Sequence, residues 1–240
     1  MIELHSSPTP NGQKVMIMLE ELGIEWKHID VNLRLAEHLR PEFLKMNPNN
    51  KIPVIVDTDG PGGRYSLMES GAILFYLAEK TGKFMSSDPR KRYGTLQWLM
   101  FQMASVGPMF GQANFYSKHA KGAELQYARD RYNNEAMRIY RVMDNRLREN
   151  AWLAGDEYTI VDMATYPWTK GHKDLGVDKA GYPGFMRWFE AMEARPAVQR
   201  SNKMADEIRA RMTKAAEGKN AIDIHDNKYS TERLSEGVRR

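Results

Sequence analysis

The chain has 240 residues, enough for one large domain or two small domains with a sizeable buried core. Hydrophobic residues make up 42% and charged residues 28%, as in soluble globular proteins, and no apolar run approaches the roughly 18 residues that span a bilayer. The net charge of +4 favours anionic ligands, but lysines and arginines are spread thinly, so neither nucleic acid nor a membrane is expected as a partner. The N-terminus has no basic segment followed by an apolar core, and we therefore expect a cytoplasmic protein.

The sequence contains no cysteine. This excludes structural disulfides, thiolate metal sites and a protein thiol nucleophile, so any thiol–disulfide chemistry must use sulfur that arrives with a ligand. The six histidines are scattered without the spacing of metal ligands, and no metal is expected.

The first 50 residues predict short alternating elements. Their order is a strand at Ile2–His5, a helix that starts at Asn11 or Gly12 and stops at Gly23, a strand at Glu25–Val31 and a helical turn at residues 40–44. Such an order favours a small mixed sheet covered by helices.

The stretch from Asn49 to Leu77 carries the chemistry. A β-hairpin is expected from strands at residues 54–56 and 65–68, with the turn formers Asp57–Gly63 between them. Glu69 and Ser70 then open an apolar helix, whose N-terminal N–H groups can bind a carboxylate. With the Ser70 hydroxyl and the Glu69 carboxylate, this junction suits a ligand end that bears both a carboxylate and an ammonium group, although an ordinary helix cap has the same sequence pattern.

After Gly82 no convincing strand follows. Helical spacing predicts helices at residues 93–104 and 124–149, with an interruption at Gly107-Pro108. Thr159 and Asp162 have the spacing of a capping box at the start of a further helix. This half is expected to be all-helical.

Three motifs in this order resemble the glutathione transferase superfamily, namely S-P-T-P-N-G at residues 7–12, N-N-K-I-P-V at 49–54 and M-E-S-G-A-I-L at 68–74. The resemblance is narrowest to the Nu class, which is related to the fungal nitrogen-regulator prion protein. It implies an α/β thioredoxin-like, glutathione-binding domain at residues 1–82, an all-α domain at 88–213 and a charged C-terminal tail at 214–240.

The resemblance also implies a set of site residues. Thr9 and Asn11 would stabilise the glutathione thiolate, with Ser6 and Ser7 as alternative donors, and Arg131 would assist a second glutathione beside Gln112. The tripeptide itself would bind through Glu69 and Ser70 at its γ-glutamyl end, Ile52 before Pro53 at its cysteinyl backbone, and Lys51 with His38 at its glycyl carboxylate. His38 departs from the family, which often has Gln at this position.

For function, the resemblance implies a disulfide-bond reductase that uses glutathione as co-substrate, with one or two molecules or one glutathione disulfide per subunit. Two alternatives remain: a transferase or thioether lyase acting on an aromatic substrate, and a non-catalytic regulatory module. The family also implies a homodimer whose partners are glutathione and a small disulfide or electrophile.

Overall fold

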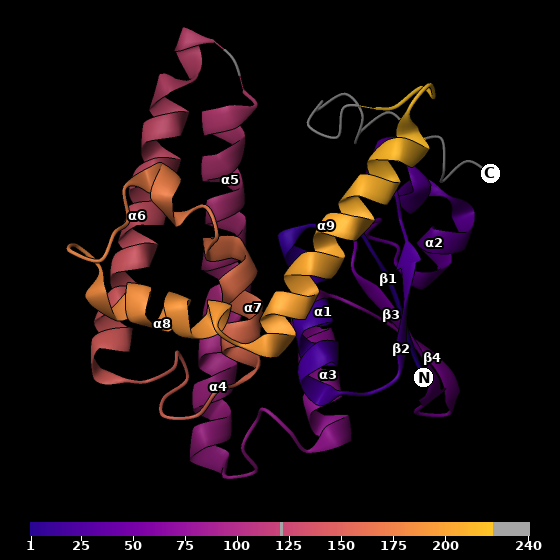
Figure 1. Cartoon of the computed structure of the whole chain (residues 1–240), viewed down its shortest axis with the longest axis horizontal. Coiled ribbons are helices and arrows are strands. Elements are labelled where there is room, and N and C mark those ends of the chain that lie inside the picture. Colours follow the sequence, from indigo (N-terminus) through magenta and orange to yellow (C-terminus); the bar gives the residue numbers. More distant parts are fainter. Residues whose placement is uncertain (121, 223–240) are drawn as a thin grey trace. The chain divides into compact units, whose positions relative to one another are not determined.

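The computed structural model describes residues 1–120 and 122–222, and these divide into two compact units (Figure 1). The first unit comprises residues 1–73 together with the described residues from Arg200 on, and the second comprises residues 74–199. None of the helices in the described ranges is long and apolar enough to cross a membrane. The predicted domain limits at residues 82, 88 and 213 remain predictions, and most of the tail predicted from residue 214 lies outside the described residues.

The first unit contains a four-stranded mixed sheet in the order β2-β1-β3-β4. The strands β1 and β2 are parallel, whereas β3 is antiparallel to both β1 and β4. Helix α1 lies on one side of the sheet and α2 on the other (Figure 1). The elements are β1 (Ile2–Ser6), α1 (Pro10–Leu22), β2 (Trp26–Asp30), α2 (Pro41–Met46), β3 (Val54–Gly60), β4 (Gly63–Met68) and α3 (Ser70–Thr81).

Local signals determine where α1 begins and ends. Thr9 is the N-cap, Pro10 occupies the first turn, and Gly23 ends the helix in the left-handed conformation with φ 65°. Every residue from Gly12 to Leu19 is buried, so polar side chains in this stretch are enclosed along with the apolar ones. The thioredoxin-like expectation for this half of the chain is confirmed.

The hairpin differs from the prediction in its turn. Strand β3 continues to Gly60, so the segment from Asp57, expected as a turn, mostly lies in the sheet, and Asp57 pairs with Tyr65. Asp57 is fully buried, and a register irregularity lies between it and Gly60. The sequence did not predict that β3 continues to Gly60, because burial of the strand overrides the turn propensity of its residues.

The second unit is helical, as predicted. Its elements are α4 (Pro89–Phe101), α5 (Gly107–Lys118), α6 (Gln126–Glu149), α7 (Ile160–Thr169), α8 (Pro183–Glu193) and the start of α9 (Pro196–Ala216). The predicted interruption at Gly107-Pro108 is a π-helical turn at residues 102–106 followed by α5, because Pro108 has no N–H to donate. The capping box of Thr159 and Asp162 at the start of α7 is confirmed.

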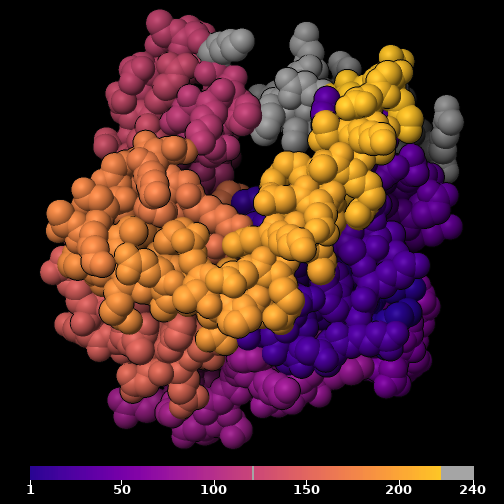
Figure 2. All heavy atoms as spheres, viewed as in Figure 1, coloured from indigo at the N-terminus to yellow at the C-terminus, as the bar shows by residue number. Residues whose placement is uncertain are grey.

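The later part of α9, from Arg200 on, belongs to the first unit. Arg211 forms two hydrogen bonds with Asp30, at 2.6 and 2.7 Å, and the Asn32 amide donates to the Met212 carbonyl at 2.8 Å. In Figure 2 the yellow atoms of this helix lie over the indigo atoms of the N-terminal residues. Helix α9 is therefore hydrogen-bonded to the end of β2 and the residues that follow it, across a sequence separation of 180 and 181 residues.

Candidate functional site

The sheet brings the three sequence motifs to one edge. In the register of the sheet His5 at the end of β1 pairs with Val54 at the start of β3, and Val54 pairs with Met68 at the end of β4. The loop after β1, the segment before β3 and the start of α3 therefore lie at the same edge. This edge holds Thr9, Asn11, Ile52, Pro53, Glu69 and Ser70.

The loop before α1 is held by its serines. Ser6 Oγ donates to the Ser7 carbonyl at 3.1 Å, and Ser7 Oγ donates to the Val31 carbonyl at 2.5 Å. Both serines are buried. A Cβ at Gly12 would lie 2.2 Å from the Ser7 carbonyl oxygen, so only glycine allows this approach of loop and helix. The two serines considered as thiolate donors thus donate their hydroxyl protons to backbone carbonyls of the protein.

Thr9 and Asn11 are accessible in part. Thr9 Oγ1 accepts a hydrogen bond from Gly12 N at 3.4 Å. A hydroxyl has one proton to donate besides the lone pairs with which it accepts, so Thr9 can cap α1 and donate to a ligand at the same time. The N-terminal end of α1 adds positive potential at this point.

The segment before β3 is ordered by its own hydrogen bonds. The Ile52-Pro53 peptide bond is cis, and Asn47 Nδ2 donates to the Lys51 carbonyl at 2.6 Å. Lys51 itself is exposed. Burial, and then the positive charge of Lys51, lower the pKa of His38, so this imidazole is neutral at pH 7. A carboxylate bound here would form an ion pair with Lys51 and accept a hydrogen bond from His38.

The start of α3 is the most charged part of this edge. Glu69 is exposed, has φ 69°, and its carbonyl accepts the first helical hydrogen bond from Ile73 N at 2.9 Å. Ser70 is buried, and Lys14 Nζ donates to its Oγ at 3.2 Å. Burial lowers the pKa of Lys14 to about 7 although Glu69 opposes the shift. A carboxylate, a hydroxyl and a buried amine thus meet where the helix offers its free N–H groups.

Sequence reasoning did not identify Lys14 or Asn47 as part of this edge. Lys14 offered a signal: it is the one charged side chain between Asn11 and Leu19, a stretch whose other residues are apolar, Gly or Gln. A lysine enclosed in such a stretch needs a polar partner. The partner lies on an element 56 residues away, which is why the sequence alone did not name it.

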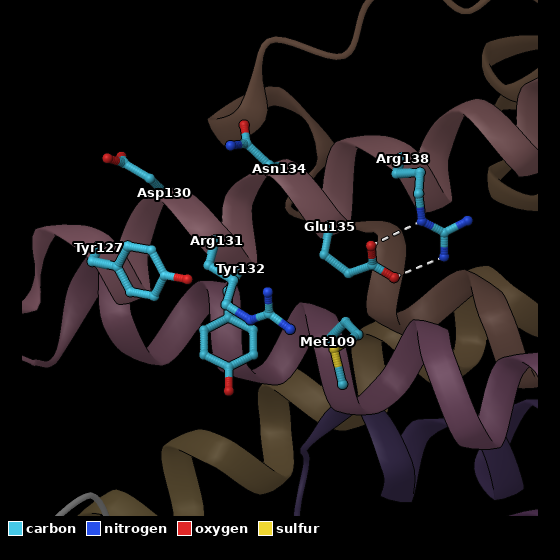
Figure 3. A pocket seen from close by; sticks show the side chains of 8 residues that line it. All are labelled: Met109, Tyr127, Asp130, Arg131, Tyr132, Asn134, Glu135 and Arg138. Carbon is cyan, nitrogen blue, oxygen red and sulfur yellow. Dashed lines mark hydrogen bonds and ion pairs between the residues drawn. The ribbon is translucent and has the colours of Figure 1, made fainter.

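The second unit contains a groove of about 630 Å³ along α5 and α6 (Figure 3). Arg131 is exposed in this groove, and within the described part of the chain its guanidinium makes no hydrogen bond or ion pair. Arg138 by contrast is held by Glu135 through two hydrogen bonds of 2.7 and 2.8 Å. The groove is lined by Met109, Tyr127, Asp130, Arg131, Tyr132, Asn134, Glu135 and Arg138.

Gln112, the other site residue expected in the helical half, is exposed on α5 and is absent from that lining. The predicted residues are thus divided between the two units. Thr9, Asn11, His38, Lys51, Ile52, Pro53, Glu69 and Ser70 belong to the first unit, and Gln112 and Arg131 belong to the second.

Comparison with known proteins identifies both halves. Residues 2–79 match the family model "Glutathione S-transferase, N-terminal domain", and residues 100–196 match "Glutathione S-transferase, C-terminal domain". Disulfide-bond oxidoreductase YfcG of Escherichia coli is 46% identical over 201 residues, covering 82% of this chain and 93% of that protein. Transcriptional regulator URE2 of Saccharomyces cerevisiae is 32% identical over 228 residues, covering 79% of this chain and 64% of that protein.

Solved structures agree with the family models. A glutathione transferase from Burkholderia graminis, with two glutathione molecules bound per subunit, is 45% identical with a TM-score of 0.80, covering 83% of this chain and 86% of that chain. A glutathione transferase from Pseudomonas putida, with one glutathione disulfide bound per subunit, is 43% identical with a TM-score of 0.78, covering 83% of this chain and 90% of that chain. The chain belongs to the glutathione S-transferase family.

Proposed function

We propose that this protein is a glutathione-dependent disulfide-bond reductase of the Nu class. The observation that carries the proposal is the loop before α1, where Thr9 keeps a hydroxyl proton available while Ser6 donates its proton to the Ser7 carbonyl and Ser7 donates its proton to the Val31 carbonyl. A donor at a helix N-terminus lowers the pKa of a bound thiol, because it stabilises the thiolate. The similarity to YfcG supports disulfide reduction in particular.

The reaction needs no protein sulfur. The thiolate of one glutathione attacks a sulfur of the substrate disulfide, which breaks the S–S bond, forms a mixed disulfide and releases the first substrate thiolate. The thiolate of a second glutathione then attacks the glutathione sulfur of the mixed disulfide, which releases the second thiolate and leaves glutathione disulfide. Both electrons come from the two glutathiones, as a sequence without cysteine requires.

The tripeptide would bind along the common edge of the sheet. Glu69 would pair with the γ-glutamyl ammonium, and Ser70 with the N–H groups of α3 would bind its carboxylate. The Ile52 backbone, before Pro53, would pair with the cysteinyl residue. Lys51 and neutral His38 would bind the glycyl carboxylate.

The second glutathione would be bound with the help of Arg131. Its guanidinium is exposed in the groove of α5 and α6 and is not committed to a neighbour in the described residues, which leaves it able to meet a carboxylate in bidentate fashion. Gln112, on α5, would contribute a further polar contact. The Burkholderia relative with two bound glutathiones supports a second molecule per subunit.

We also propose a cytoplasmic homodimer. The cytosolic glutathione pool is reducing, which keeps the co-substrate in its thiol form, and homodimerisation follows the family. Light scattering on the purified protein that gave the mass of one chain would reject the dimer.

The test is a comparison of two activities with glutathione: reduction of a small disulfide, followed by coupling to glutathione reductase, and conjugation of an aryl halide. We expect fast reduction and weak conjugation. Fast conjugation with no reduction would instead make the protein a transferase. Activity on aryl thioethers alone would make the protein a thioether lyase. Glutathione binding with no activity in any of the three assays would favour a regulatory module, as the similarity to URE2 allows.

A further inference from the structure

The loop before α1 is contacted by a helix from the other end of the chain. The part of α9 from Arg200 on belongs to the first unit, and the family match of the C-terminal domain ends before it, at residue 196. One face of this part of the helix is buried, and its residues have helical spacing: Ser201, Ala205, Ile208, Met212 and Ala216.

Two side chains of α9, one turn apart, meet consecutive residues of the loop. Met212 Sδ lies 3.7 Å from Ser7 Oγ, and Arg209 Nη2 donates to the Pro8 carbonyl at 3.3 Å. The Asn32 amide holds the same turn of α9, because it donates to the Met212 carbonyl at 2.8 Å. The helix is therefore fixed in place where it reaches the loop.

The contact with Pro8 bears on the residue that follows it. The Pro8 carbonyl and the Thr9 N–H belong to one planar peptide group. Its N–H donates to the Ser7 carbonyl at 2.8 Å, and its carbonyl accepts from Arg209. The Thr9 carbonyl in turn accepts from Gln13 N at 2.9 Å. The backbone is thus held on both sides of Thr9, and this sets the direction in which the Thr9 side chain leaves the backbone.

Arg209 is itself oriented by a neighbour on α9. Its Nη1 donates to Asp206 Oδ1 at 2.7 Å, which leaves Nη2 directed to the Pro8 carbonyl. A planar guanidinium has enough donors for both acceptors at once. The Arg209 side chain is 56% exposed, so the contact is directional but modest in strength.

We propose that Arg209 is a positioning residue for the reaction: its hydrogen bond to the Pro8 carbonyl orients the peptide group before Thr9 and so directs the Thr9 hydroxyl to the glutathione thiolate. Direction matters because a hydrogen bond weakens steeply as its angle departs from linearity. The inference rests on the proposed function, since it takes Thr9 as the thiolate donor.

The test measures the pKa of the bound glutathione thiol, from the pH dependence of thiolate absorbance, and the rate of disulfide reduction. Arg209→Ala is compared with the wild type, and the same substitution is made in the Thr9→Val background. Lys203→Ala is the matched control, because it also removes one exposed cation of α9 and an ion pair within that helix. Binding of S-methylglutathione, which has no thiolate, reports whether the tripeptide site is intact.

We expect Arg209→Ala to raise the pKa of the bound thiol by about half a unit and to slow disulfide reduction near neutral pH roughly threefold, the size of one exposed charged contact. In the Thr9→Val background Arg209→Ala should change neither value, because a residue that acts through the Thr9 hydroxyl loses its effect with that hydroxyl. Lys203→Ala should titrate as the wild type, and Arg209→Ala should bind S-methylglutathione with unchanged affinity.

An equal effect of Arg209→Ala in the Thr9→Val background would overturn the positioning role, because Arg209 would then act directly through its charge. A wild-type titration in Arg209→Ala, or the same shift in Lys203→Ala, would overturn it as well. Weaker binding of S-methylglutathione by Arg209→Ala would assign Arg209 a structural role instead. A bound thiol that titrates in the wild type as in free glutathione would overturn the proposed function itself.

Discussion

At the entry to α1, hydroxyl groups only a few residues apart have different tasks. The Ser7 hydroxyl donates its proton to the Val31 carbonyl and so joins the loop to the end of β2. Thr9, by contrast, caps the helix by accepting a hydrogen bond with its side-chain oxygen. A cap and a ligand donor can therefore coexist in one side chain. The geometry therefore permits Thr9 both to cap α1 and to donate to a ligand.

Replacing Thr9 by Val should raise the pKa of the bound glutathione thiol by about one unit, because a hydrogen bond to a charged group contributes about 1.5 kcal/mol or more. Disulfide reduction near neutral pH should fall roughly tenfold. The measurement is the pH dependence of thiolate absorbance in the complex. Thr9→Ser is the control and should restore the wild-type titration; a wild-type titration in Thr9→Val would remove Thr9 from the chemistry.

Arg131 and Arg138 line the same groove, but only the guanidinium of Arg138 is hydrogen-bonded to Glu135. Arg131→Ala should therefore weaken binding of the second glutathione roughly tenfold, the value of one charge-assisted contact, while Arg138→Ala changes it little. Steady-state rates against glutathione concentration would measure this. Equal effects of both substitutions would indicate a general electrostatic contribution instead of a specific contact.

At the scale of elements, α7 depends on its capping box. Asp162 is completely buried and accepts hydrogen bonds from the Leu153 and Thr159 backbone N–H groups and from the Trp188 indole, all within 2.9–3.0 Å. It therefore joins the start of α7 to the preceding loop and to α8. Removing it would leave several buried donors without an acceptor.

Asp162→Ala should lower the free energy of unfolding by about 3 kcal/mol, measured by urea denaturation. Burial raises the pKa of Asp162 to about 6 in the fold. The stability linked to its protonation is therefore present below its unfolded pKa and is lost as pH rises through about 6. The difference in the free energy of unfolding between the wild type and Asp162→Asn should become smaller from pH 5 to pH 7. A difference in the free energy of unfolding that does not depend on pH would contradict this raised pKa.

The end of α9 is joined to β2 by Arg211 and Asp30. The guanidinium of Arg211 holds the pKa of Asp30 below its usual value. Both side chains are partly exposed, so we expect Arg211→Ala to cost only about 0.5–1 kcal/mol at neutral pH.

This contribution is present above the unfolded pKa of Asp30 and should disappear as pH falls through the lowered pKa of the folded state. Thermal unfolding of Arg211→Ala and the wild type at several pH values would measure it. Lys203→Ala, which removes an exposed ion pair within α9 with an N–O distance of 4.0 Å, should leave the melting temperature unchanged. A larger loss in acid than at neutral pH would contradict the assignment.

For the whole molecule, the sequence predicted those features of the fold that depend on local sequence patterns. The mixed sheet, the helical second half and the capping box were readable because strands, caps and helical periodicity are local patterns. The end of β3 was not, since Asp57 is a turn former that burial keeps in a strand. The return of α9 to the first unit depends on contacts such as Asn32 with Met212, 180 residues apart, for which no local pattern exists.

The site shows the same limit. Glu69, Ser70 and Thr9 could be proposed from the sequence because each belongs to a motif at the end of an element, and the sheet register brings these ends to one edge. Lys14 could not be assigned a task, because its partner is defined only by the packing of α1 against the start of α3. Gln112, predicted from the resemblance, is exposed outside the groove that Arg131 lines, and its role stays a prediction.

The central claim is that two glutathiones on one subunit supply all the sulfur for disulfide reduction. The most direct test is the binding stoichiometry of glutathione and of glutathione disulfide, measured by calorimetry on the wild type and on Arg131→Ala. We expect two glutathiones, or one glutathione disulfide, per subunit in the wild type, with the second glutathione weakened in Arg131→Ala. A single glutathione per subunit, with no binding of the disulfide, would contradict the account.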